Sequence, residues 1–134
     1  MSRELVQLAE DSYHRCADGR FYDTFYAHLL ASDPRIPPMF ATTEFERQHR
    51  LLKHALGLLI IYAKRPNPAL LDRIAERHTE VGVGDDMYPA FVDSLVLTVS
   101  EHDPEYTPEL ADAWRTALAP GIAYMRARRA GSAR

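Results

Sequence analysis

The stretch that decides the fold is Arg77-His78-Thr79-Glu80-Val81-Gly82-Val83-Gly84-Asp85-Asp86-Met87-Tyr88-Pro89-Ala90-Phe91. His78 stands at the end of a short predicted helix, directly before a corner marked by glycines. A second helix is expected to begin near Tyr88-Pro89, because proline is tolerated in the first turn of a helix. A histidine at such a corner can present one imidazole to a metal ion.

The length of 134 residues is common for one domain, so we expect a single domain over residues 1–134. The N-terminus lacks the apolar core of a secretory signal, and no apolar run is long enough to cross a bilayer. We therefore expect a cytoplasmic protein without a membrane partner.

The net charge of −3 argues against nucleic-acid binding. Cys16 is the lone cysteine, allows no internal disulfide, and is expected to be buried in the first helix.

The chain is predicted to be all-α, because it reads as helices separated by short loops, without the alternating pattern of strands. A polar cap followed by proline marks three helix starts: Asp33-Pro34, Asn67-Pro68 and Thr107-Pro108. A capping box is predicted at Thr43-Glu44-Phe45-Glu46. Together these signals predict about seven helices: 2–17, 20–32, 34–40, 45–64, 68–80, 86–102 and 107–128.

The longer helices carry apolar faces at helical spacing, as expected for core packing. The face predicted for the fourth helix is Leu51, Leu52, Ala55, Leu58, Leu59 and Tyr62. The stripes predicted for the last two helices are Phe91, Leu95, Val99 and His102, and Leu110, Trp114, Leu118, Ile122 and Met125.

The segment that begins at His78 resembles the proximal segment of the globins, in which a histidine is followed four residues later by Gly-Val and ten residues later by Tyr-Pro. The resemblance covers nearly the whole chain and implies a globin fold around a haem pocket. His78 would be the axial ligand of haem b (iron protoporphyrin IX). Leu52, Val83 and Phe91 would contact the cofactor. Arg77 would either reach a haem propionate or remain a surface arginine.

The opposite wall of the pocket follows from the same resemblance. Globins commonly have a phenylalanine six residues after the proline that opens the third helix, and counting from Pro34 gives Phe40. Eight residues before this proline the family places the side chain that faces the bound gas, here Tyr26. Tyr26 shares a helical face with Tyr22 and Phe25, which directs it inward. The alternative is a core tyrosine whose hydroxyl binds a backbone carbonyl.

The distal residue of the fourth helix depends on the alignment. Counting seven residues from Phe40 gives Arg47, whereas aligning the apolar residues of this helix gives Gln48 and implies a one-residue insertion ahead of it. Gln48 shares an apolar face with Leu52, while Arg47 leads into a charged face. We therefore take Gln48 as the distal residue, with His49 as the alternative.

A Tyr26 and Gln48 pair resembles bacterial single-domain globins and the globin domain of flavohaemoglobins. Flavohaemoglobins also join the ligand histidine to a tyrosine ten residues on, here Tyr88, and to a glutamate in the last helix. This chain has Arg129 at the corresponding place. This relay from histidine to tyrosine to glutamate is therefore expected to be incomplete in this chain. The alternative role of Tyr88 is to hold the corner after His78 in place.

The resemblance implies a protein that reversibly binds oxygen and other diatomic ligands such as NO and CO. Two hydrogen-bond donors would favour oxygen, which gains negative charge when bound. An alternative is a nitric oxide dioxygenase with Tyr26 and Gln48 as catalytic residues. That activity needs a separate reductase, because no flavin or nicotinamide motif is present. A third reading is a gas sensor or a haemless interaction module.

Overall fold

The computed structural model describes residues 2–132, and side chains are described for residues 3–128. Its α-helices are α1 (Ser2–Cys16), α2 (Gly19–Ser32), α3 (Phe45–Lys64), α4 (Asp72–Val81), α5 (Tyr88–His102) and α6 (Pro108–Ser132). Short 3₁₀ helices η1 (Pro37–Phe40), η2 (Pro68–Leu70) and η3 (Asp85–Met87) precede α3, α4 and α5. No strand occurs within residues 2–132, which confirms the all-α prediction. None of these helices has the length and hydropathy needed to span a bilayer.

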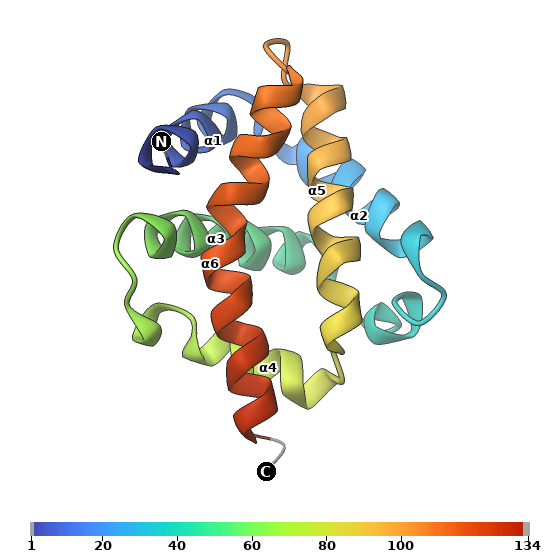
Figure 1. The fold of residues 1–134 in the computed structure, drawn as a ribbon. Coiled ribbons are helices and arrows are strands. Elements are labelled where there is room, and N and C mark those ends of the chain that lie inside the picture. Colours follow the sequence, from blue (N-terminus) through green and yellow to red (C-terminus); the bar gives the residue numbers. More distant parts are fainter. Residues whose placement is uncertain (1, 133–134) are drawn as a thin grey trace.

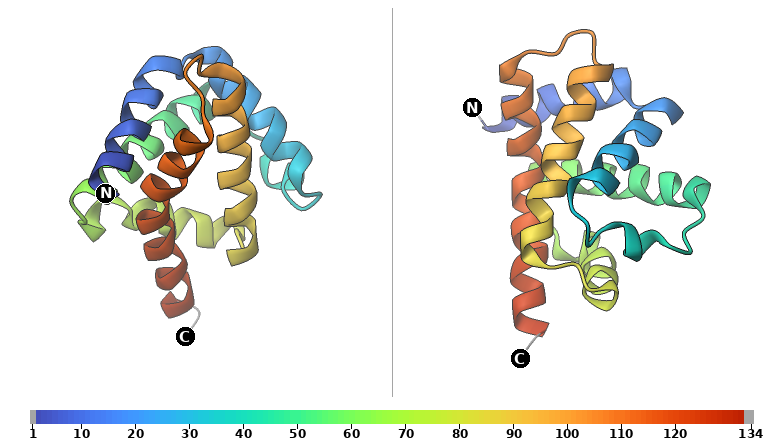
Figure 2. Two further views of the ribbon diagram at one scale, coloured as in Figure 1. Left: turned by 45° about the horizontal axis from the view of Figure 1, so that its top comes forward. Right: turned by 90° about the vertical axis from the view of Figure 1, so that its right-hand side faces the viewer.

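Helices α5 and α6 are antiparallel neighbours, and the longer α6 runs the length of the molecule (Figure 1). Helices α3 and α4 both pack on α6 and cross it on the same side, at different heights (Figure 2). Helix α1 packs on α6, and α2 packs on α5. This arrangement brings α2, α3, α4 and α5 around one region of the fold, where the candidate site lies.

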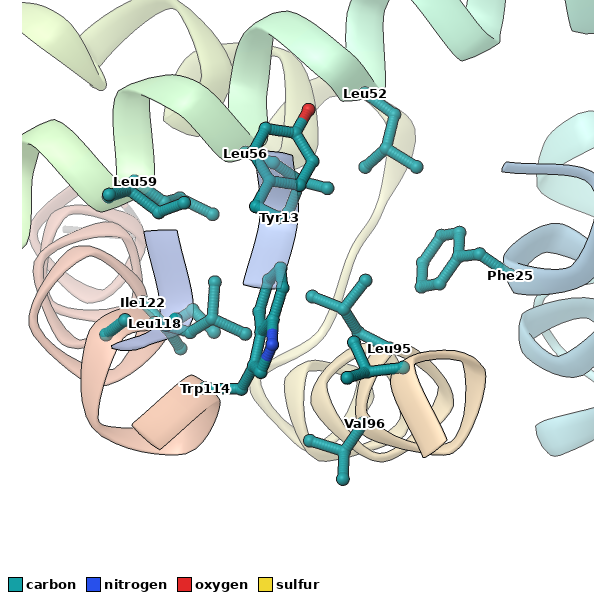
Figure 3. Packing of buried hydrophobic residues seen from close by; sticks show 14 of the residues in the cluster. Tyr13, Phe25, Leu52, Leu56, Leu59, Leu95, Val96, Trp114, Leu118 and Ile122 are labelled. Carbon is teal, nitrogen blue, oxygen red and sulfur yellow. The ribbon is translucent and has the colours of Figure 1, made fainter. Parts of the chain in front are cut away.

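Trp114 of α6 lies at the centre of the core, between α1, α3 and α5 (Figure 3). Its indole stands edge-on to the ring of Tyr13, with the ring centroids 6.0 Å apart. The indole N–H donates to the Ser12 hydroxyl at 3.0 Å, and that hydroxyl donates to Asp103 Oδ2 at 2.6 Å. Arg15 adds two hydrogen bonds to Asp103. The polar groups buried beside Trp114 are therefore satisfied.

Several local predictions are confirmed. Asn67 caps η2 by accepting the N–H of Ala69 at 3.1 Å, and Thr107 Oγ1 accepts the N–H of Leu110 at 3.2 Å. Cys16 is buried in α1. The predicted stripe of α6 is buried throughout: Leu110, Trp114, Leu118, Ile122 and Met125.

The helix predicted over residues 34–40 is present but shorter, because only its second half is helical, as the 3₁₀ helix η1. Residues 34–36 form a turn in which Asp33 accepts the N–H of Arg35 at 2.8 Å, and η1 begins only at Pro37. Proline removes a backbone donor and disfavours helical geometry at the preceding residue, so Pro37 and Pro38 prevent a longer α-helix.

Two predictions for the fourth helix are wrong. The capping box is absent, because Glu44 is the N-cap of α3 and makes no side-chain cap bond. Leu51 is 50% exposed, while Leu56 and Ile60 occupy the core instead. The core face of α3 is centred on Leu52 and Leu56, and Leu51 lies about 100° around the helix from Leu52.

Candidate functional site

His78 lies in the last turn of α4, and its backbone helps to end the helix. The N–H of Val83 donates to the carbonyl of His78 at 2.9 Å, and the N–H of Gly82 donates to the carbonyl of Thr79 at 3.2 Å. Gly82 has φ 85°, the left-handed conformation that glycine adopts without steric cost. This pair of bonds is a Schellman motif, which fixes the backbone that carries the imidazole.

The imidazole of His78 is oriented by the next helix. Its Nδ1 lies 3.2 Å from the hydroxyl oxygen of Tyr88, the first residue of α5. Nε2 has no hydrogen-bond partner among the described residues. Burial lowers the pKa of His78, which favours the neutral imidazole. One ring nitrogen is therefore engaged, and the other is left for a ligand bond.

An aromatic cluster links α5, α2 and α3. Phe91 stands edge-on to Phe25, with centroids 5.4 Å apart, and Phe25 stands edge-on to Tyr26 at 5.1 Å. Tyr26 in turn meets Phe40 at 5.7 Å and Phe45 at 5.5 Å. Phe40, Phe45 and Phe91 are only partly buried, so apolar surface remains at this part of the fold.

Tyr26 is 4% exposed and points inward, as its helical face predicts. Its hydroxyl donates to the backbone carbonyl of Gln48 at 3.5 Å, a long hydrogen bond. Burial raises the pKa of Tyr26 to about 12, although the nearby Gln48 side chain acts in the opposite direction. The structure thus brings Tyr26 and Gln48 together. The Tyr26 hydroxyl binds a backbone carbonyl, as expected if Tyr26 is a core tyrosine, the alternative prediction from the sequence.

His49 lies beside the same tyrosine. Its ring stacks on Tyr26, with centroids 5.6 Å apart and an interplanar angle of 7°. Its Nε2 lies 3.4 Å from Asp23 Oδ1. Neither this contact nor the place of Phe45 in the cluster was predicted from the sequence. Phe45 could have been predicted from its position in the sequence, between Phe40 and the distal candidates Gln48 and His49.

The other candidate residues lie at different depths. Leu52 is buried and points into the core (Figure 3). Val83 is partly buried in the corner after α4. The Arg77 side chain is 71% exposed and pairs with Glu80 at 3.3 Å, so it faces solvent in this structure. The side chain of Arg129 lies outside the described residues, so the expected gap in the relay stays a prediction.

These features define an all-α protein with one imidazole at a helix corner and an aromatic cluster around a buried tyrosine. Residues 23–125 match the family model described as Globin. The match covers most of the chain, so this chain belongs to the globin family, and a haem cofactor follows from that membership.

The chain is similar in structure to the protein PA3967 of Pseudomonas aeruginosa PAO1, which is described as structurally highly homologous to a human hemoglobin. The two sequences are 33% identical, the alignment covers 92% of this chain and 96% of that chain, and the TM-score is 0.87. The similarity confirms the predicted globin fold. Among curated proteins, none has a significant match to this chain.

The residues present fit a haem. A haem iron in this family takes a neutral imidazole, and His78 offers one whose Nδ1 is already engaged by Tyr88. The partly buried aromatic side chains Phe40, Phe45 and Phe91 would supply the apolar surface that a porphyrin needs.

Proposed function

We propose that this chain is a single globin domain that binds haem b through His78 and reversibly binds oxygen. The observation that carries the proposal is the contact between His78 Nδ1 and the Tyr88 hydroxyl at 3.2 Å. When Nδ1 carries the ring proton and donates it to Tyr88, the lone pair of Nε2 is available to iron. The haem would supply reversible binding of diatomic gases.

Proximal residues would set the strength of the iron–imidazole bond. Through its contact with Nδ1, Tyr88 would hold the tautomer and the ring orientation of His78. The Schellman motif at Gly82 fixes the backbone of the same residue. Val83 and Phe91 would contact the porphyrin from the corner and from α5. Arg77 would have to leave Glu80 to reach a propionate.

On the distal side, Tyr26 and Gln48 would contact the bound gas. The 3.5 Å bond from the Tyr26 hydroxyl to the Gln48 carbonyl is long, so the hydroxyl can turn toward a ligand at low cost. The amide of Gln48 would be the second donor. The Nε2 of His49 faces Asp23 instead, which supports Gln48 over His49 as the distal residue. Two donors in an apolar site predict high oxygen affinity.

Titration of the full-length protein with hemin tests the proposal. A saturable Soret band is expected, with a shifted and weakened band in His78→Ala. The matched control is His54→Ala, because His54 is exposed on α3 and should leave the spectrum unchanged. Haem binding that is identical in all three proteins would reject His78 as the ligand.

Nitric oxide dioxygenation is a second candidate function, favoured by the proximity of Tyr26 and Gln48. It would use the same distal residues to convert NO and oxygen to nitrate, and a separate reductase would restore ferrous iron. Mixing the oxygenated protein with NO and measuring nitrate, with and without a flavin reductase, tests it. Repeated turnover with the reductase supports an enzyme, and one turnover at most supports a binding protein.

A further inference from the structure

A parallel ring stack on the distal side involves His49, a residue that the proposed function leaves without a role. The His49 ring stacks on the face of Tyr26 with an interplanar angle of 7°, and it lies 5.9 Å from the Tyr22 ring. The His49 side chain is only 21% exposed, and its Nε2 lies 3.4 Å from Asp23 Oδ1. His49 belongs to α3, whereas the three residues around it belong to α2.

We propose that His49 is a positioning residue for Tyr26, held in place by Asp23, and that it controls how the Tyr26 hydroxyl meets a diatomic ligand. This inference rests on the proposed function, because it needs Tyr26 to face the gas. It assigns His49 no bond to the ligand, since its Nε2 faces Asp23 rather than the inside of the fold.

The geometry around Tyr26 explains why a stacked neighbour matters. Phe25, Phe40 and Phe45 stand tilted toward the Tyr26 ring at interplanar angles of 72°, 66° and 72°. Among the described residues, His49 is the one ring neighbour that lies parallel to it. With its face and its edges packed, the phenol ring keeps one orientation. Only the hydroxyl hydrogen is then free to turn between the Gln48 carbonyl and a ligand.

The contact between Asp23 and His49 fixes the position of the His49 ring more than it stabilises the fold. Asp23 is 74% exposed, and a contact of this kind at the surface contributes little to the free energy of folding. The Asp23–His49 contact joins α2 to α3, the two helices that also carry the Tyr26 hydroxyl and the Gln48 carbonyl. A change at Asp23 or His49 would therefore alter the spacing on which that donor and acceptor depend.

Oxygen dissociation kinetics of the haem-loaded protein test the inference. His49→Ala should raise the dissociation rate roughly tenfold, the effect of one weakened hydrogen bond. His49→Phe keeps the stack and should recover most of that loss, while Asp23→Asn should lie between wild type and His49→Ala. The matched control His54→Ala, on the exposed side of the same helix, should leave the rate unchanged.

A double-mutant cycle separates positioning from general destabilisation. In a Tyr26→Phe background, His49→Ala should have no further effect on the oxygen dissociation rate, because no hydroxyl remains to be positioned. An equal effect of His49→Ala in both backgrounds would overturn the inference. If Tyr26→Phe raises the rate and His49→Ala does not, the inference fails while the proposed function stands. If Tyr26→Phe leaves the rate unchanged, the distal part of the proposed function fails, and the inference with it.

A readout without haem is also available. In the full-length apoprotein with ring-labelled tyrosine, the two edges of the Tyr26 ring should give separate NMR signals, because stacking restricts ring flips. The signals should merge in His49→Ala and stay separate in His49→Phe and His54→Ala. Merged signals in the wild type, or separate ones in His49→Ala, would contradict a positioning role.

Discussion

The Nδ1 of His78 lies 3.2 Å from the hydroxyl oxygen of Tyr88, ten residues further along the chain. The contact joins the end of α4 to the start of α5 across the corner that contains Gly82 and η3. It orients the ring and assigns the proton to Nδ1 when Nε2 binds a metal.

Replacement of Tyr88 by phenylalanine should therefore weaken haem binding. The ring stays and the hydrogen bond is lost, so haem affinity should fall by roughly 10- to 100-fold, the usual effect of removing a partner of a ligand histidine. The rate of haem transfer to apomyoglobin measures this loss of haem affinity. Tyr106→Phe is the control, because the Tyr106 hydroxyl makes no hydrogen bond among the described residues. Equal transfer rates in both variants would show that the contact is only structural.

Acid should destabilise the fold through His78. Burial lowers the folded pKa of His78 below its unfolded value, so the unfolded chain takes up the proton first. The stability that depends on a neutral His78 is fully present above about pH 6.5, the pKa of histidine in the unfolded chain. It is lost as the pH falls below that value. Urea unfolding of the apoprotein at pH 7.5 and pH 5 checks this. The stability of the wild type relative to His78→Ala should fall toward pH 5, and a constant difference would contradict the account.

Gly82→Ala should destabilise the corner. At φ 85° an alanine is strained by about 1–2 kcal/mol, although the space around the glycine is open. The change should also loosen haem, because the Val83 N–H bonds to the His78 carbonyl in the same motif. Gly19→Ala is the matched control, since Gly19 has open space and no positive φ. Chemical denaturation of both variants measures the difference.

Gly121→Ala tests the packing of α6 against α3. A Cβ at Gly121 would collide with the side chain of Leu59 and lie 3.2 Å from Leu71 Cδ1, and both leucines are buried. We expect a loss of about 1–3 kcal/mol, although alanine is the better helix former. Gly57→Ala in α3 meets nothing within 4 Å and should stabilise the protein by up to about 1 kcal/mol. Similar unfolding free energies for both variants would count against this packing.

Local sequence signals predicted much of this structure, and contacts between helices account for what they missed. The inward face of Tyr26 follows from helical periodicity, whereas the pairing of His78 with Tyr88 was expected from the resemblance to the globins. The stack of His49 on Tyr26 depends on how α2 crosses α3, which periodicity does not contain. The exposure of Leu51 could not be predicted for the same reason. Apolar residues occur on more than one face of α3, so periodicity alone does not show which face packs against the other helices.

The most direct test of the account is the ferrous spectrum of His78→Gly with added imidazole. The cavity left by the side chain should admit free imidazole, which would take the place of the lost ligand. His78→Gly should lose the wild-type Soret band and the iron–histidine stretch, and millimolar imidazole should restore both. A ferrous spectrum that is unchanged by the substitution, or that imidazole alters equally in wild type and variant, would contradict the assignment of His78 as the haem ligand.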